Sequence, residues 1–480
     1  MAGLLFSVAP GLGGDRLAVA RRADLARSYV RFEHTFRDHP PEERLVAGLN
    51  RDFDAATLSF FTMRFADALE KIDGLSWRLL PENERLSARA LAWSLRITAD
   101  PPVLVAGSRE LRLRVESLYL PSAAQGGTAV QLRLRLRNGA GPTHLALDYA
   151  FRADPASAVE LDQAVPSAEQ LKPGPCQIEI TDDAGEALTT IPFYVVEKSL
   201  DSTAVAFRRR LAALKPDTDA QRQAVEICRA RVGLLADEPS EFDSAQFLAN
   251  PLALTSEIET ELRTLEQRKA PYRNKCGDYW RVIVTATARI PMRIYAPRTI
   301  ANGKPPLLVA FHGAGGDENM FMDGYGAGAI VRLAEKQGIL IASPATASIL
   351  RDISSFKSLL DGLALDYEFD PRRVYVLGHS MGAAAAVAAA AEFPNRIAGI
   401  ACIAGGGNWQ APHLPPTQLV IAELDAVAGA DRLARAAAAA NSNGAQLEVV
   451  RIKDHGHTLV VGHVLENVWT WLSQHKTVAD

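Results

Sequence analysis

The hydrophobic pattern changes its period twice within the first 270 residues. From Asp15 to about Leu80, apolar residues recur three and four positions apart, and the breaker DHPPEE interrupts them, which predicts two or three helices. From about Ala88 to Glu197, apolar and charged residues alternate, as in AVQLRLRLRNGAG, and this period of two predicts strands with one face in water. Such strands are expected to form a small antiparallel sandwich. A second helical pattern runs from about Ser202 to Lys269 and predicts helices that link two domains.

After Cys276, short apolar runs alternate with helical patterns. Runs such as PPLLVAF, VYVL and QLVIAEL are apolar at nearly every position, as in parallel strands that are covered on both faces. This part is therefore predicted to be an α/β domain with a mostly parallel sheet flanked by helices. The expected domains are a helical segment (1–85), an immunoglobulin-like β-sandwich (86–199), a helical linker region (200–272) and the α/β domain (273–480).

Length and charge narrow the classes of function. A chain of 480 residues exceeds the size at which one hydrophobic core stops growing, so two or more domains are expected. The formal net charge of -4 gives no general attraction for nucleic acid or an anionic membrane, and we predict no nucleic-acid role. No segment approaches the roughly 18 apolar residues of a membrane helix, so no membrane span is predicted. The composition leaves the oligomeric state unknown.

The cysteines and the N-terminus add little about cofactors or compartment. Cys176, Cys228, Cys276 and Cys402 are far apart, with no CxxC pair and no histidine at ligand spacing, so neither a zinc site nor a dense disulfide framework is expected. The N-terminus, MAGLLFSVAPGLGG, lacks a positive region and a long apolar run. It is either the remnant of an export signal or a frayed terminus, and localisation in the cytoplasm or outside it stays open.

The strongest chemical motif is GHSMG, which runs from Gly378 to Gly382. The apolar run VYVL precedes it and an alanine-rich helical pattern follows it. A GxSxG nucleophile elbow requires this order of strand, turn and helix, with glycines where a side chain would collide with neighbouring elements. Ser380 is therefore the candidate nucleophile. An ordinary turn between strand and helix is the alternative.

A serine hydroxyl needs a base, and the base needs a partner that orients it. In sites of this type both follow the serine along the chain and lie at strand ends. Asp425 directly follows the apolar run QLVIAEL, and we prefer it to Asp431, which falls within the next helical pattern. His457 follows the run LEVVRIKD, and a glycine before it frees the loop to reach Ser380. His455 is its rival as the base, and helix capping is the alternative role of Asp425.

The oxyanion and the substrate need partners too. Acyl transfer uses backbone N–H groups that point at one place, and we expect them from Met381 and from Ala314 in the loop HGAGG, with Gly315 as the alternative to Ala314. Trp409 and Phe321 are candidate residues of the substrate pocket. Burial at a domain edge for Trp409 and core packing for Phe321 are the alternatives.

The segments HGAGG, DPRRVYVLGHSMG, ELD and HGHT, taken together, resemble the α/β-hydrolase superfamily of serine esterases. More narrowly, they are similar to its feruloyl esterase and polyhydroxyalkanoate depolymerase-like branch. The resemblance covers about Gly277 to His475 and does not include the first 270 residues, whose role it leaves unassigned. Prolyl-oligopeptidase-type peptidases have closely similar elbow sequences.

This resemblance implies a serine hydrolase that cleaves carboxylic esters through an acyl-enzyme intermediate, with the triad Ser380, Asp425 and His457. It implies no metal and no organic cofactor, and an ester substrate that is small, bulky or polymeric. A serine peptidase remains the alternative within enzymes. A catalytically inert binding or adhesion protein is the alternative of another class, because a fold alone does not define a function.

Overall fold

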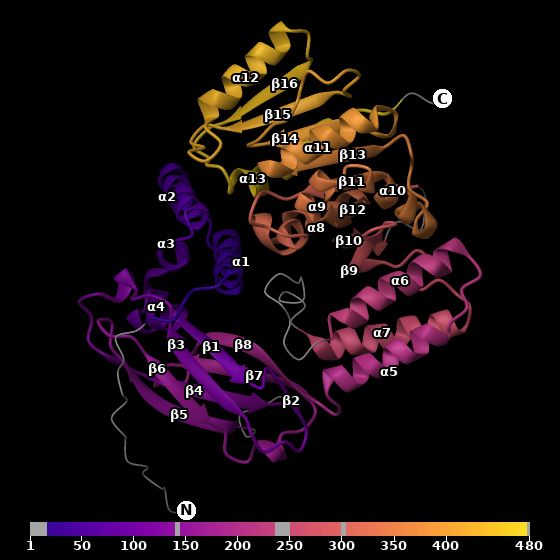
Figure 1. Cartoon of the computed structure of the whole chain (residues 1–480). Helices are drawn as coiled ribbons and strands as arrows, with labels where there is room; N and C mark the ends of the chain where they lie inside the picture. Colours follow the sequence, from indigo (N-terminus) through magenta and orange to yellow (C-terminus); the bar gives the residue numbers. More distant parts are fainter. Residues whose placement is uncertain (1–16, 140–144, 236–249, 299–303, 478–480) are drawn as a thin grey trace, which may run out of the picture. The chain divides into compact units, whose positions relative to one another are not determined.

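The computed structural model describes residues 17–139, 145–235, 250–298 and 304–477 (Figure 1). The expectation of an export-signal remnant concerns residues outside these ranges. The chain divides into two compact units. The first unit contains the chain up to Ser28, Met63–Leu200 and Asn250–Leu252, and the second contains Tyr29–Thr62 and the rest of the chain from Asp201. The predicted domain boundaries remain predictions.

The first unit contains the predicted β-sandwich. Its helices are α3 (Phe65–Leu79) and α4 (Ser87–Trp93), and its strands are β1 (Leu95–Asp100), β2 (Val103–Val105), β3 (Arg112–Ser117), β4 (Val130–Asn138), β5 (Leu145–Ala153), β6 (Glu160–Ala164), β7 (Gly174–Thr181) and β8 (Ala187–Val196). One sheet has the order β1-β3-β6 and the other β2-β8-β7-β4-β5. The sandwich is confirmed, but it is not wholly antiparallel, because β2 pairs with β8 in parallel.

The period of two in the sequence explains why this unit forms a sandwich. In β4, Leu132, Leu134 and Leu136 are completely buried in a core to which both sheets contribute. On the other face of the same strand, Nε of Arg133 donates to Asp148 of β5 at 2.7 Å. Because successive side chains of a strand point to opposite faces, the alternation of leucine and arginine separates the core from the solvent.

The second unit is built on one large sheet. Its strands are β9 (Gly277–Val284), β10 (Arg289–Ala296), β11 (Leu307–Phe311), β12 (Leu340–Pro344), β13 (Val374–His379), β14 (Gly399–Ile403), β15 (Thr417–Ala422) and β16 (Leu447–Ile452). Their order is β16-β15-β14-β13-β11-β12-β10-β9. The pairs from β16 to β12 are parallel, and β10 runs antiparallel to β12 and β9. The predicted mostly parallel sheet is confirmed.

Burial distinguishes the central strands from the edge strand. In β11, β13, β14 and β15 every residue is buried, which matches their continuous apolar sequences. In the edge strand β16 several residues are exposed. The carboxyl ends of the parallel strands all lie on the same side of the sheet, across the strand direction. Open α/β sheets bind ligands at the carboxyl ends of their strands.

Helices cover both faces of this sheet. The helices that follow its strands are α8 (Tyr325–Gln337), α9 (Thr346–Arg351), α10 (Ser355–Asp366), α11 (Met381–Glu392), α12 (Ala430–Ser442) and α13 (Val460–Leu472). The helices α8 and α13 share a core with Leu308 and Leu377, on one face of the sheet. On the opposite face, the ring of Phe311 in β11 contacts Phe356 of α10.

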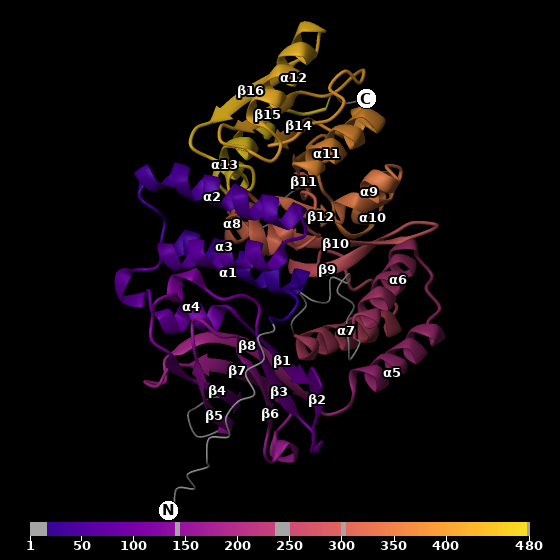
Figure 2. The same ribbon diagram turned by 60° about the vertical axis from the view of Figure 1, so that its left-hand side comes forward.

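The remaining helices precede the sheet along the chain. They are α1 (Arg22–Asp38), α2 (Glu43–Phe61), α5 (Leu200–Ala213), α6 (Asp219–Gly233) and α7 (Pro251–Glu266). They confirm the two helical stretches that the sequence predicts. The helix α2 belongs to the second unit, and Figure 2 shows it beside α13. Of the helices in the described ranges, none is both long enough and apolar enough to span a bilayer.

A buried carboxyl group in the second unit predicts a pH-dependent stability. Burial raises the pKa of Glu318 from 4.5 to about 7, and its carboxyl accepts a hydrogen bond from the indole N–H of Trp280 at 2.7 Å. The folded protein therefore binds a proton that the unfolded chain releases near pH 4.5, and stability falls as pH rises from about 4.5 to about 7. The substitution Glu318→Gln keeps an acceptor for Trp280 and removes the charge. We expect this substitution to remove up to about 3 kcal/mol of the loss of stability between about pH 4.5 and 7. Melting temperatures of both proteins, measured against pH, test this prediction. Parallel curves for the two proteins would contradict the prediction.

Candidate active site

Ser380 lies in the sharp turn between β13 and α11. Its backbone has φ 54° and ψ −117°, a conformation that residues other than glycine rarely adopt. Its N–H donates to the carbonyl of Ile403 in β14 at 2.9 Å, which fixes the turn to the neighbouring strand. The side chain of Ser380 is only partly buried. The turn therefore has the strained geometry of a nucleophile elbow, at the carboxyl end of a central strand.

The two glycines of GHSMG are required by close backbone contacts. A Cβ atom on Gly378 would lie 2.0 Å from the carbonyl oxygen of Gly382, and a Cβ atom on Gly382 would lie 1.9 Å from that of Phe311. Gly405, which follows β14, is equally constrained, because its Cβ atom would lie 2.4 Å from the carbonyl oxygen of Ser380. Gly405 is not among the predicted residues, although the run GGG, one residue after a buried strand, is a usable signal.

Asp425 and His457 form a buried hydrogen-bonded pair. Nδ1 of His457 lies 2.9 Å from Oδ2 of Asp425, and both side chains are almost inaccessible to solvent. Oδ1 of Asp425 accepts hydrogen bonds from the N–H groups of Val427 at 2.9 Å and Ala428 at 2.7 Å. Asp425 thus holds its own turn with one oxygen and the imidazole with the other. Because the carboxylate accepts from Nδ1, Nε2 of His457 is left to accept a proton.

The rival residues lie in other surroundings. Asp431 is exposed in the first turn of α12. The ring of His455 stacks on that of His463 in α13 with 4.1 Å between centroids, and its Nδ1 lies 2.8 Å from the carbonyl of Lys453. The structure therefore brings together Asp425 and His457 of the predicted candidates, and places Asp431 and His455 apart from that pair.

Ser380 and His457 are connected through His379. Among the described residues, no hydrogen bond joins the hydroxyl of Ser380 to the imidazole of His457. Instead, Nε2 of the buried His379 lies 3.0 Å from the carbonyl oxygen of His457. Since a carbonyl can only accept, this nitrogen donates, and Nδ1 of His379 accepts from the hydroxyl of Tyr325 at 2.7 Å.

These contacts fix the protonation of His379. Burial and the nearby His457 lower the pKa of His379 well below 6.5, so its imidazole is neutral, as the two hydrogen bonds require. The Tyr325 hydroxyl also accepts from the N–H of Gly313 at 3.3 Å. A chain of buried polar groups thus joins the HGAGG loop, the elbow and the loop of His457. Single positions within a short motif give no sign of such a chain, so it could not be predicted from the sequence.

The predicted oxyanion residues lie next to Ser380. Met381 is the first residue of α11, so its N–H belongs to the free donors of a helix N-terminus. A Cβ atom on Gly313 would lie 3.3 Å from Cβ of Ser380, which shows how closely the HGAGG loop passes the serine. Ala314 follows in an exposed position. Their role as oxyanion donors remains a prediction.

The two predicted pocket residues differ in their surroundings. Phe321 has no exposed surface and contacts Tyr325 within the core, and its pocket role remains a prediction. Trp409 is largely buried against Gly406, where a Cβ atom would lie 2.1 Å from the indole. It also lines a cavity of about 640 Å³ at the amino ends of β15 and β16. Asp425 and His457 come after the carboxyl ends of these two strands. A substrate contact of Trp409 remains a prediction.

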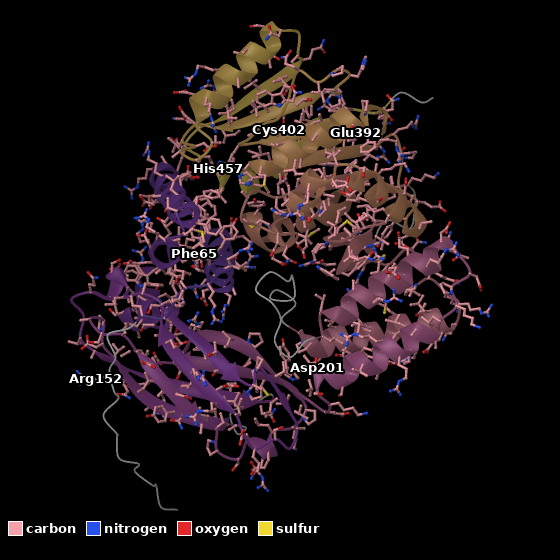
Figure 3. All side chains as sticks on the ribbon, in the orientation of Figure 1. Phe65, Arg152, Asp201, Glu392, Cys402 and His457 are labelled. Atoms are coloured by element: carbon pink, nitrogen blue, oxygen red, sulfur yellow. The ribbon has the colours of Figure 1, made fainter. Side chains whose placement is uncertain are left out.

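The cysteines of the second unit are not arranged for metal binding. Cys402, labelled together with His457 in Figure 3, is buried in β14, and burial raises the pKa of its thiol to about 12. All four cysteines of the sequence are free thiols. Across the described ranges, no group of three or more histidine, cysteine, aspartate or glutamate side chains is placed to hold a metal ion.

Comparison with known proteins identifies the fold. The sequence matches the family model of the alpha/beta hydrolase fold over residues 367–461, a segment that includes Ser380, Asp425 and His457. No protein of curated function matches the chain. With the sheet order and the elbow described above, this match shows that the C-terminal part of the chain has the α/β-hydrolase fold.

Several solved structures are similar to 41% of the chain. A fluorophosphonate-binding serine hydrolase of Staphylococcus aureus is 12% identical, with 96% of its chain covered and a TM-score of 0.36. An esterase of Pyrobaculum calidifontis is 19% identical, with 83% covered and a TM-score of 0.33. An S-formylglutathione hydrolase of Agrobacterium tumefaciens is 12% identical, with 94% covered and a TM-score of 0.34.

The close contact at Gly382 predicts a strong effect of one methyl group. In Gly382→Ala, the new Cβ atom would collide with backbone rather than with a movable side chain. We expect a destabilisation at or above the upper end of the usual 1–3 kcal/mol for overpacking. In Gly233→Ala, at the end of α6, the Cβ atom meets nothing within 4 Å, and stability should be unchanged or slightly higher. Urea unfolding of both variants measures the difference; equal midpoints would contradict it.

Proposed function

We propose that this chain is a serine hydrolase that cleaves carboxylic esters through an acyl-enzyme intermediate. The observation that supports this most is the hydrogen bond of 2.9 Å between Asp425 and His457, at the sheet edge where Ser380 lies in its strained turn. Three residues from three strand ends occur in the chain order that this chemistry uses. An inert protein has no chemical reason to bury an aspartate and a histidine in this orientation.

In the proposed mechanism, Oγ of Ser380 attacks the ester carbonyl carbon while Nε2 of His457 takes the hydroxyl proton. The carbon–oxygen bond to the alcohol then breaks, and the alcohol oxygen takes the proton from His457. In the second half of the reaction, His457 takes a proton from water as the water oxygen attacks the acyl carbon. The bond to Oγ of Ser380 then breaks, Oγ takes the proton from His457, and the acid leaves. Asp425 keeps Nδ1 protonated and stabilises the imidazolium that forms. The hydrogen bond between Ser380 and His457 forms in the substrate complex, as is common where the free enzyme lacks it.

The negative charge on the carbonyl oxygen needs fixed donors. We assign this role to the N–H groups of Met381, at the N-terminus of α11, and of Ala314, in the HGAGG loop. Donors that are already oriented need no reorganisation during the reaction, which is why such sites often make the largest single contribution to the rate. Gly313 is unsuited as a donor, because its N–H already donates to Tyr325.

For the substrate, we propose an ester of the kind that the feruloyl esterase and polyhydroxyalkanoate depolymerase-like branch cleaves, because the motifs around the site resemble that branch. This includes bulky aryl esters and polyesters. A panel of p-nitrophenyl esters, a feruloyl ester, a short polyester and an aminoacyl anilide separates esterase from peptidase. We expect turnover of the esters and none of the anilide. Preference for the anilide would identify a peptidase instead.

Covalent labelling tests the nucleophile. A fluorophosphonate probe should form an adduct with the intact protein, and Ser380→Ala should abolish both the adduct and turnover of a p-nitrophenyl ester, lowering kcat by at least about 10⁴-fold. Mass spectrometry of the labelled protein locates the adduct. If the intact protein forms no adduct, the proposed function is wrong.

Paired substitutions test the base and the acid. His457→Ala and Asp425→Asn should lower kcat by roughly 10⁴-fold, because the first removes the base and the second favours the wrong imidazole tautomer. The matched variants His455→Ala and Asp431→Asn should keep nearly full activity, because neither side chain contacts the pair. Steady-state kinetics of the four variants with one ester measures this. Loss of activity confined to the matched variants would reverse the assignment.

A further inference from the structure

The helix α2, far from the hydrolase part in sequence, accepts several hydrogen bonds from the loops of the candidate site. Asp54, in the middle of α2, is 1% exposed. Its Oδ1 accepts from the N–H of His457 at 2.9 Å, and its Oδ2 accepts from the N–H of Ala426 at 3.0 Å. One carboxylate therefore bridges the loop of the candidate base and the loop of the candidate acid, directly next to Asp425.

A second residue of α2 supports the same loops. Asn50 lies one helical turn before Asp54 and is completely buried. Its Oδ1 accepts from the N–H of Gly456 at 2.8 Å, while its amide nitrogen donates to the carbonyl of Val46 at 2.9 Å within α2. The amide is thus used on both sides, and the loop before His457 is held at two consecutive N–H groups.

Close packing explains the glycine before His457. A Cβ atom on Gly456 would lie 2.7 Å from Oδ1 of Asp54 and 3.0 Å from the carbonyl oxygen of Asn50. Only glycine therefore lets the loop approach α2 closely enough for these hydrogen bonds. In the sequence, this glycine suggests freedom of the loop; in the structure, it allows the loop to be fixed.

The C-terminal end of α2 also contacts the HGAGG loop. A Cβ atom on Gly315, which has φ +83°, would lie 2.3 Å from the ring of Phe60. The helix α2 therefore contacts the segments that contain the candidate acid, the candidate base and the candidate oxyanion loop. Figures 1 and 2 both show α2 beside the end of the sheet next to α13.

From these contacts we infer that Asp54 is a positioning residue of the catalytic centre: it acts through the backbone of His457 and Ala426 and holds base and acid in register. This inference rests on the proposed function. Burial of a carboxylate costs free energy unless hydrogen bonds compensate it. The hydrogen bonds that compensate Asp54 come from the loops of His457 and Asp425. Both loops are fixed to one rigid helix, and small displacements of catalytic groups cost much of the rate.

The substitution Asp54→Asn tests the bridge with little change in volume. An amide has one acceptor oxygen, and its NH2 group faces the second N–H as donor against donor. We expect kcat for a p-nitrophenyl ester, and the rate of fluorophosphonate labelling, to fall by about 10²-fold. KM should change little, because the substrate does not touch Asp54.

The matched control is Asp52→Asn, which removes the same charge from an exposed position of the same helix. It should keep the activity of the unmodified protein. Circular dichroism and melting curves establish that both variants are folded. If folded Asp54→Asn retains the rate of the control, the inference is overturned while the proposed function stands. If the unmodified protein is not labelled at all, the proposed function fails, whatever the variants do.

A pH profile of the unmodified protein tests the inference without any substitution. Burial, and to a lesser extent the charge of Asp425, raise the pKa of Asp54 to about 6, while the two backbone N–H groups and His457 act in the opposite direction. The titratable groups that act on Asp54 are thus Asp425, after β15, and His457, before α13. Protonation of Asp54 weakens it as an acceptor for both loops.

The labelling rate should therefore fall as pH decreases through about 6, where Asp54 is protonated. In Asp54→Asn, the fall below about pH 6 should be less steep, because the protonation of Asp54 no longer contributes to it. A residue that merely stabilised the fold would leave the shape of the profile unchanged. A labelling rate of the unmodified protein that stays constant as pH decreases through about 6 would overturn the inference, even if Asp54→Asn failed to fold.

Discussion

The tight packing of the β13 turn against its neighbours is the constraint on which the candidate site depends. The helix α11 leaves β13 so steeply that Gly382 touches the backbone of Phe311 in β11, and Gly405 touches that of Ser380. No side chain fits at these contacts, and the conformation of Ser380 is strained as a result. The surrounding sheet, buried on both faces, supplies the packing that maintains this strain, and the serine hydroxyl is thereby presented at the sheet edge.

Buried polar groups around this turn are satisfied in one consistent pattern. His379 is neutral, donates to the carbonyl of His457 and accepts from Tyr325. His312 accepts from the N–H of Thr346 at 3.0 Å through Nε2, so its Nδ1 donates to the carbonyl of Gly313 at 2.8 Å. Each buried imidazole thus holds a loop of the candidate site by its backbone. Burial excludes water from these bonds, which makes the loops rigid and makes each missing partner costly.

Most of the fold could be predicted from the sequence, because each element has a local signal. The alternation of leucine and arginine in β4 and the unbroken apolar runs of β11 and β13 follow from one or two buried faces, which any chain with these patterns must satisfy. The parallel pairing of β2 with β8 could not be predicted, since strand direction depends on the path of the chain rather than on periodicity. Nor could the burial of Phe321, because a core residue and a pocket residue have the same apolar side chain.

The sequence by itself determined the strained serine turn and the candidates for acid and base, because glycines at a strand end and polar residues after buried strands leave a local trace. Only the tertiary structure decided that Asp425 lies against His457 rather than His455, and that Asp54 and Asn50 hold the backbone of their loops. The contacts of Asp54 with His457 and of Asn50 with Gly456 join residues 403 and 406 positions apart. Their hydrogen bonds are made to backbone N–H groups, which every residue except proline possesses, so no residue type in the sequence announces them.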